Sequence, residues 1–189
     1  MLRDISLHIL DLTQNSISAG ASEIRIDVAG DTENQRLSVR IEDNGCGMSE
    51  EFLASVTDPF TTSRKTRNVG MGIPFFKLAC EQSGGRLEIR SQVNVGTVLS
   101  GDFEISNIDR LPLGDLGETM RFLISGAPQT RFVLTLRSSK GSFLFDTAEV
   151  EKELDGVPIT EYEILQWICD YINENVQIIF GGVLNEIVS

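Results

Sequence analysis

Two segments in which apolar and polar residues alternate, 23–30 and 36–43, place the strongest constraint on how this chain can fold. Their apolar positions are Ile24, Ile26, Val28, Leu37, Val39 and Ile41. A period of two puts such residues on one face of a strand, and the polar stretch 31–35 between the segments predicts a turn. We therefore expect an antiparallel hairpin whose apolar face is covered by other elements.

The segments around this hairpin are expected to alternate between helices and strands. A helix is predicted from about Leu2 to Ser18, where apolar residues recur at helical spacing. Ser49 is suited to cap a short helix to about Ser55, residues 73–82 have a helical pattern, and RLEIRS and GTVLSGDFEIS alternate like paired strands. This order of elements predicts an α+β fold, a two-layer sandwich of helices on a sheet.

A change in composition over 107–118, which is rich in Gly, Pro and acidic residues, divides the chain into an expected first domain, 1–106, and a C-terminal α+β extension, 107–189. Within the extension, MRFLISG, TRFVLTLRS and GSFLFDT are predicted as strands. TAEVEKELDG and PITEYEILQWICDYINENV are predicted as helices, the second with Thr160 and Glu163 in capping-box positions. The extension either continues the first sheet or forms a separate subdomain.

The aromatic residues of the extension are spaced as core packing requires. We expect core positions, rather than an interface, for Phe122, Phe132, Phe143, Phe145, Trp167 and Tyr171. The acidic residues between Glu149 and Asp155 are expected on a solvated helix face.

Composition and charge exclude several classes of partner. With 189 residues, 41% of them hydrophobic, the chain is long enough to bury one substantial core. Its formal net charge of −12 opposes binding to nucleic acids or anionic membranes, which need a basic surface. No apolar run reaches membrane-spanning length, so we expect a cytoplasmic protein. Cys46, Cys80 and Cys169 have neither CxxC nor metal-ligand spacing and are expected to be reduced.

A stripe of small polar residues runs along the first predicted helix. Asp4, His8, Asp11, Asn15 and Ser18 are three or four residues apart, so they lie on one helix face. A face of this kind either contacts solvent or points at a ligand.

Two glycine-rich stretches follow the stripe. In DNGCG, Asp43 ends a predicted strand; its carboxylate is suited to accept from an exocyclic amine, and Gly45 and Gly47 allow close approach to a flat ring. A plain tight turn explains the same residues. In DPFTTSRKTRNVGMG, a basic, hydroxyl-rich loop leads into the start of a helix, where backbone N–H groups favour polyphosphate. The alternative is a disordered surface loop.

Asn15, DNGCG, GMG and the later Gly96-Thr97 resemble, in order and spacing, the GHKL ATPases, the superfamily of gyrase, heat-shock-chaperone, histidine-kinase and mismatch-repair ATP-binding domains. The resemblance covers about 4–105. It implies a Bergerat fold, in which helices cover one face of a mixed, mainly antiparallel sheet, with ATP and Mg²⁺ as ligands. QNSISAGASEIRIDV and DNGCGMSEE look like mismatch-repair ATPases of the MutL type, whereas DPFTTS, GMGIPFFKLACEQSGGRLEI and NVGT look like sensor histidine kinases.

The resemblance also implies roles for single residues. Asn15 would bind Mg²⁺, Asp43 would accept from the adenine amino group, and Thr97 would support Asp43 through a water. Gly45 and Gly47 would line the adenine pocket. Backbone N–H groups would bind the phosphates beneath a lid over 61–67, with Gly70, Met71 and Gly72 supplying the N–H groups and Thr61, Thr62, Arg64 and Lys65 in the lid.

One turn before the metal-binding asparagine, ATP-hydrolysing relatives usually have glutamate and histidine kinases often have asparagine, whereas this chain has Asp11. A carboxylate can orient and deprotonate an attacking water, so Asp11 is the catalytic candidate, and its shorter side chain predicts slow hydrolysis. The alternative is that Asp11 only orders a metal-bound water. His8, the only histidine, lies on the same helix, which makes it a poor phosphoacceptor.

Three functions are compatible with this resemblance. The first is a Mg²⁺-dependent ATP-binding module that signals nucleotide state, through the lid, to a protein partner on the C-terminal extension. The second is a protein kinase acting in trans, like the anti-sigma serine kinases. The third is a non-catalytic nucleotide sensor or scaffold.

Overall fold

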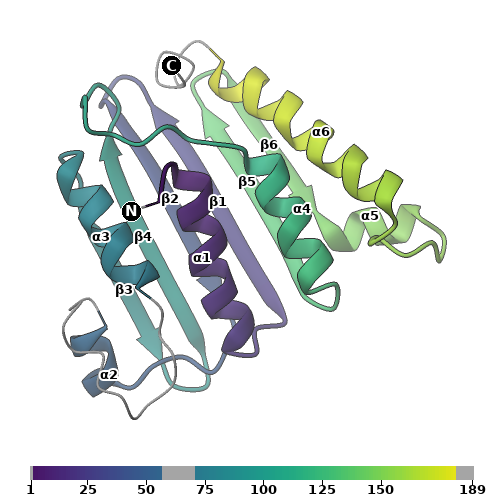
Figure 1. Cartoon of the computed structure of the whole chain (residues 1–189), viewed down its shortest axis with the longest axis horizontal. Helices are drawn as coiled ribbons and strands as arrows, with labels where there is room; N and C mark the ends of the chain where they lie inside the picture. The colour runs from purple at the N-terminus through teal and green to yellow at the C-terminus, as the bar shows by residue number, and fades with distance from the viewer. Residues whose placement is uncertain (1, 57–70, 182–189) are drawn as a thin grey trace.

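The computed structural model describes residues 2–56 and 71–181, in which six strands form one mixed sheet covered by helices on one face (Figure 1). The order across the sheet is β3-β4-β2-β1-β5-β6. The strands are β1 (Glu23–Asp31), β2 (Arg36–Asp43), β3 (Leu87–Gln92), β4 (Gly96–Glu104), β5 (Arg131–Ser138) and β6 (Gly141–Asp146). The predicted α+β sandwich is confirmed.

The hairpin that the alternation predicts is β1 paired antiparallel with β2. Ile26 lies opposite Ile41 and Val28 opposite Val39, and all four side chains are buried beneath the helices. The second predicted pair, β3 and β4, is also antiparallel, and β4 joins it to β2. The period-two patterns therefore predicted the strands β1 to β4 and the pairing within each of the two hairpins.

Helices α1 (Ile5–Ser18), α3 (Gly72–Gln82), α4 (Leu116–Gly126) and α6 (Tyr162–Phe180) lie side by side on the covered face (Figure 1). The first helix begins three residues later than predicted, because the Asp4 carboxylate caps it by accepting from the Leu7 N–H at 2.9 Å. Two short helices are α2 (Glu50–Ser55), capped by Ser49 as predicted, and α5 (Thr147–Glu153). No helix in the described part of the chain is long and apolar enough to span a membrane.

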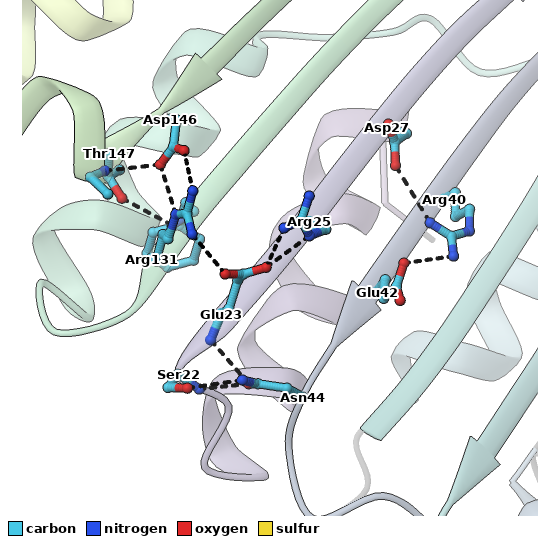
Figure 2. Close-up of polar contacts among 12 residues, drawn as sticks. Ser22, Glu23, Arg25, Asp27, Arg40, Glu42, Asn44, Arg131, Asp146 and Thr147 are labelled. Atoms are coloured by element: carbon cyan, nitrogen blue, oxygen red, sulfur yellow. Dashed lines mark hydrogen bonds and ion pairs between the residues drawn. The ribbon is translucent and has the colours of Figure 1, made fainter. Parts of the chain in front are cut away.

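The opposite face of the sheet is charged. Arg25 and Asp27 alternate along β1 with buried isoleucines (Figure 2). Arg25 pairs with Glu23 of the same strand, and Asp27 pairs with Arg40 of the neighbouring strand β2. Arg131 of β5 contacts Glu23 of β1 at 3.0 Å and binds Asp146, at the end of β6, through two nitrogens. Exposed ion pairs of this kind contribute little stability. The apolar core lies on the other face, where buried strand residues pack against the helices.

The C-terminal extension continues the first sheet. Its strand β5 pairs in parallel with β1, with Leu134 opposite Ile26, and β6 pairs antiparallel with β5. Side chains from both parts of the chain form one buried cluster, in which Ile26, Leu134 and Ile168 are fully buried. Of the two arrangements that the sequence left open, the structure therefore has the continuous sheet.

One predicted strand is wrong, because MRFLISG lies in the helix α4. The helix begins at Leu116, and the Asp115 carboxylate caps it by accepting from the Glu118 N–H at 2.7 Å. Its buried residues Leu116, Met120, Leu123 and Ile124 are spaced for a helix. Only part of this stripe lies within MRFLISG, where a period of two fits as well as a period of 3.6.

Two further expectations for the extension are corrected. The helix α6 has Glu161 at its N-cap position with no side-chain cap bond, so the capping box of Thr160 and Glu163 is not formed. Phe132, Phe143 and Phe145 are in the core, but Phe122, Trp167 and Tyr171 are exposed, with 57%, 51% and 38% of their surface accessible. For Trp167 and Tyr171, spacing identified the helix α6 but did not distinguish its inner face from its outer one. Phe122 belongs to α4, the helix that was predicted as a strand.

Candidate functional site

An apolar cavity lies between α1, the sheet and α2. Its volume is about 170 Å³, roughly ten times the space that one water molecule needs. It is lined by Leu12, Asn15, Ser16, Ser18, Ala19, Ile41, Asp43, Cys46, Gly47, Met48, Phe52, Val56, Ile73, Thr97 and Leu99. The cavity thus offers apolar walls and a few polar atoms, the composition of a small-molecule site.

Asp43 is the carboxylate of this cavity, and both of its oxygens have protein donors. The Ser16 hydroxyl donates to Oδ2 at 2.7 Å, and the Gly45 N–H donates to Oδ1 at 2.9 Å. These bonds fix the side chain while each oxygen keeps accepting capacity. The sequence did not identify Ser16. The available signal was its position four residues after Leu12, on the helix face that meets the end of β2.

Gly47 and Gly96 bring backbone segments close together beside Asp43. Gly47 has φ +64°, and a Cβ there would lie 2.0 Å from the Gln92 carbonyl oxygen. Gly96 has φ +137°, and a Cβ there would lie 1.9 Å from the Asp43 carbonyl oxygen. Both positions therefore require glycine. Gly45 is buried next to the cavity without lining it.

Thr97 lies opposite Asp43 in the pairing of β4 with β2 and also lines the cavity. Its hydroxyl is 2.9 Å from the Ser91 hydroxyl, which accepts from the Met48 N–H at 2.8 Å. The two hydroxyls connect the end of β2 to the sheet edge. Ser91 is a second residue of the site that the sequence did not identify, because its side chain acts through Thr97 and Met48.

Asp11 and Asn15 of α1 meet the start of α3 at Gly72; Asn15 lines the cavity, whereas Asp11 is not among its lining residues. Gly72 packs against Asp11 so closely that a Cβ would lie 2.2 Å from the carboxylate Oδ2 and 3.7 Å from the Asn15 Nδ2. The Asn15 Nδ2 is buried and has no hydrogen-bond partner among the described residues. An unpaired buried amide nitrogen is uncommon in folded proteins, so this end of the Asn15 side chain needs a partner from outside the described residues.

Met71 and Gly72 contribute the beginning of α3. Met71 is the N-cap residue, is 40% exposed, and makes no side-chain cap bond. Pro74 in the first turn has no N–H, so the free N–H groups and the positive end of the helix dipole lie at Gly72 and Ile73. The other phosphate-contact candidates, Thr61, Thr62, Arg64, Lys65 and Gly70, lie outside the described residues.

Three members of the polar stripe do not line the cavity: Asp11, which meets Gly72, and also Asp4 and His8. Asp4 is the N-cap of α1 and also accepts from the Ser6 hydroxyl. His8 is fully buried against Phe76, with ring centroids 5.5 Å apart, and neither ring nitrogen has a hydrogen-bond partner in the described chain. Burial lowers the pKa of His8 from 6.5 to about 4. The solvated-face alternative is therefore excluded for His8, whose position is structural.

The side chains of Asn15 and Asp11 suit a hard divalent cation that has few protein ligands. Asn15 supplies an amide, whose oxygen and nitrogen exchange places by a side-chain flip, and Asp11 is adjacent. Within residues 2–56 and 71–181, no three His, Cys, Asp or Glu side chains are placed to hold a metal ion. An amide oxygen is a ligand that Mg²⁺ accepts, so Asn15 fits a Mg²⁺ ion that takes other ligands from phosphate and water.

A mixed sheet with helices on one face is the architecture that the resemblance to GHKL ATPase domains predicts. Residues 3–107 match the family described as "Histidine kinase-, DNA gyrase B-, and HSP90-like ATPase", more than half of the chain, and the chain belongs to this family.

Several proteins similar to this chain are described as sensor proteins or sensor kinases. A putative sensor protein of Shewanella frigidimarina is 30% identical over 104 residues, which are 53% of this chain and 16% of that protein. A probable C4-dicarboxylate sensor kinase of Bacillus subtilis is 28% identical over 101 residues, 51% of this chain and 19% of that one. This chain therefore spans less than a fifth of these relatives.

Solved structures similar to this chain include the MutL ATPase domain of Aquifex aeolicus complexed with ADP. It is 17% identical, with a TM-score of 0.47, over 75% of this chain and 62% of that one. The N-terminal domain of a DNA repair protein is 15% identical, with a TM-score of 0.49, over 76% and 52% of the two chains.

Proposed function

We propose that this chain is a Mg²⁺-dependent ATP-binding module that passes its nucleotide state to a protein partner through the C-terminal extension. The observation that carries the proposal is Asp43, held by the Ser16 hydroxyl and the Gly45 N–H at the polar end of an apolar cavity. A carboxylate accepts only, so it selects a ring that presents an amino group, as adenine does. The apolar walls then bury the faces of the ring.

The phosphates are proposed to lie where α1 meets α3. Asn15 would hold Mg²⁺, and the N–H groups at the start of α3, at Gly72 and Ile73, would contact phosphate oxygens. When bound, Mg²⁺ neutralises phosphate charge. Residues 61–67 are the proposed lid, and Thr61, Thr62, Arg64 and Lys65 supply its hydroxyl and basic groups.

Asp11 is the proposed catalytic residue for slow hydrolysis. Its carboxylate lies against Gly72, next to the start of α3, and beside Asn15. In this position the carboxylate would orient an attacking water and accept its proton. We expect phosphate release to be lost in Asp11→Asn while nucleotide binding is kept. Hydrolysis by Asp11→Asn at the wild-type rate would remove Asp11 from this role.

The proposed path from the site to the extension runs through the first turn of α1. The Ile5 N–H donates to the Pro112 carbonyl at 2.9 Å, and the Ser6 N–H donates to the Leu113 carbonyl at 2.8 Å. Gly114 has φ +81°, and a Cβ there would lie 2.5 Å from the Ser6 hydroxyl. The connection before α4 therefore caps the helix that carries Asn15, so a displacement of α1 displaces this connection.

Helices α4 and α6 would carry such a displacement further. Gly117 lets them approach so closely that a Cβ would lie 2.3 Å from the Cys169 carbonyl oxygen. The Asn173 amide accepts from the Gly117 N–H at 3.0 Å and donates to the Asp115 carboxylate at 2.9 Å. Close contact with few adjustable side chains makes the pair move together.

Cysteine alkylation tests nucleotide binding at this cavity. Cys46 lines it, whereas burial raises the pKa of Cys80 to about 12 and that of Cys169 to about 11, which makes these two thiols slow internal controls. We expect Mg²⁺-ATP at about ten times its Kd to slow iodoacetamide labelling of Cys46 about tenfold, measured by peptide mass spectrometry.

The matched controls are Asp43→Asn, which should lose protection by ATP, and Glu33→Gln on the distant β1–β2 turn, which should keep it. Labelling of Cys46 that is as fast with ATP as without it would contradict the proposal.

A further inference from the structure

A second apolar depression lies at the far edge of the sheet, and no part of the proposed nucleotide site reaches it. We call it the edge groove; its volume is about 650 Å³, and β6, α5 and α6 form it. Its lining consists of Leu144, Phe145, Asp146, Glu149, Val150, Glu153, Leu154, Glu163, Ile164, Trp167 and Tyr171.

The aromatic wall of the edge groove is ordered and open. Trp167 stacks on Tyr171 with centroids 5.1 Å apart and ring planes 10° apart, and Tyr171 meets Phe143 edge-on at 5.3 Å. Leu144 on β6 is 64% exposed. Large rings that are already fixed lose little side-chain entropy when a partner covers them, so this apolar surface is suited to binding.

The rim of the edge groove is acidic. Glu149, Glu153 and Glu163 line it together with Asp146, and none of the lining residues is basic. Lys152 pairs with Glu149, whereas Glu153 and Glu163 form no ion pair with any described residue. Arg131 compensates Asp146 and Lys152 compensates Glu149, so the uncompensated negative charge of the rim is that of Glu153 and Glu163. Beside an apolar floor, this charge favours a cationic partner and repels phosphate-bearing ones.

A second copy of this chain would be a poor occupant. It would bring the same acidic rim and a formal net charge of −12, so like charges would face each other. A protein segment that combines Lys or Arg with apolar side chains satisfies both the floor and the rim.

The edge position of β6 adds a preferred geometry. Within the described residues β6 pairs with β5 alone, which leaves the N–H and C=O groups of its outer side available to another strand. An extended segment added there presents alternate residues to the groove. We propose that the edge groove binds an extended segment of a partner protein that brings both basic and apolar side chains to the groove.

This proposal rests on the function proposed above, because it specifies the chemistry of the protein partner. Its test needs no nucleotide. Trp167 is the only tryptophan of the chain, so its emission reports the groove directly. The probe is an acetylated, amidated Lys-Leu octapeptide, Lys-Lys-Leu-Leu repeated twice, which brings both residue types to each face of an extended chain. The matching Glu-Leu octapeptide, Glu-Glu-Leu-Leu repeated twice, is its control. At low ionic strength we expect a saturable change in Trp167 emission with the first peptide and none with the second.

Charge variants separate the groove from general attraction to an acidic protein. We expect roughly tenfold weaker binding of the Lys-Leu peptide in the triple variant Glu149→Gln/Glu153→Gln/Glu163→Gln. The control Glu33→Gln/Glu51→Gln/Asp109→Asn removes the same charge at exposed positions outside the groove and should stay within about twofold of wild type. Equal weakening in the two triple variants would overturn the proposal, as would the absence of a saturable change in emission.

Two further readouts complete the test. Amide exchange in 142–145 should slow when the peptide is bound, and binding without such protection would overturn the strand-addition geometry. Asn15→Ala should bind the peptide as wild type does. Loss of ATP protection at Cys46 with peptide binding intact would therefore refute the nucleotide proposal and leave the edge groove standing.

Discussion

The buried histidine of α1 predicts a pH dependence of stability whose size follows from its environment. Burial lowers the pKa of His8 from 6.5 to about 4, although Asp4 opposes the shift. The neutral imidazole is the form that fits the core. Between pH 6.5 and about 4, the unfolded chain therefore binds a proton at His8 that the folded chain does not bind. Stability from His8 is therefore complete above pH 6.5 and is lost as the pH falls toward about 4.

The magnitude follows from linkage. At about 1.4 kcal/mol per pH unit, a difference of about 2.5 units amounts to at most about 3.4 kcal/mol. About 2 kcal/mol of this is lost between pH 7 and pH 5, a range in which few carboxylates titrate. The assay is urea unfolding at these two pH values, with the free energy of unfolding extrapolated to water.

The control is His8→Phe, which replaces one ring by another that cannot be protonated beside Phe76. Comparison of the pH 7 and pH 5 values within each protein cancels any packing cost of the substitution. The variant should lose about 2 kcal/mol less than wild type over this range. An identical pH dependence in the two proteins, or an imidazole pKa near 6.5 measured by NMR in the folded protein, would refute the reasoning.

Three other predictions concern the fixed carboxylate, the helix pair and the end of β6. Ser16→Ala removes a hydrogen-bond donor from Asp43 and should weaken ATP binding, measured by calorimetry, roughly tenfold. Unchanged affinity would show that the Gly45 N–H alone is enough to hold Asp43. Gly117→Ala should lower unfolding free energy by about 2 kcal/mol, whereas Gly126→Ala in the same helix, with open space around its Cβ, should not destabilise. Asp146, whose pKa its arginine partner lowers, should stabilise the fold above pH 4 and cease to do so as the pH falls further; Asp146→Asn should flatten that part of the urea stability profile.

The sequence predicted the parts of the molecule in which a local pattern has only one physical solution. Alternation in 23–30 and 36–43 has no helical counterpart, so β1 and β2 and their facing were predictable. In 120–126 the pattern suits either a strand or a helix, and the capping residue Asp115 lay within a stretch rich in turn formers. The wrong assignment of α4 came from this ambiguity.

Local sequence patterns do not indicate which distant segments contact each other. Ser16 and Asp43 are 27 positions apart, and their bond depends on how α1 crosses the end of β2. His8 belonged to the polar stripe by spacing, yet α3 covers it, which no property of α1 alone indicates. The resemblance predicted Asp43 as the carboxylate of the cavity, but the donors that hold its side chain required the structure.

The parallel pairing of β1 with β5 has a consequence for synthesis on the ribosome. Glu23 and its register partner Arg131 are 108 positions apart, so β1 leaves the ribosome long before its second neighbour exists. At typical translation rates this interval is roughly 5 to 20 s. During it, an apolar central strand has an open edge available to other nascent chains. The production of soluble protein should therefore depend on elongation speed and on chaperones that bind exposed strands, and chains that end near residue 106 should aggregate.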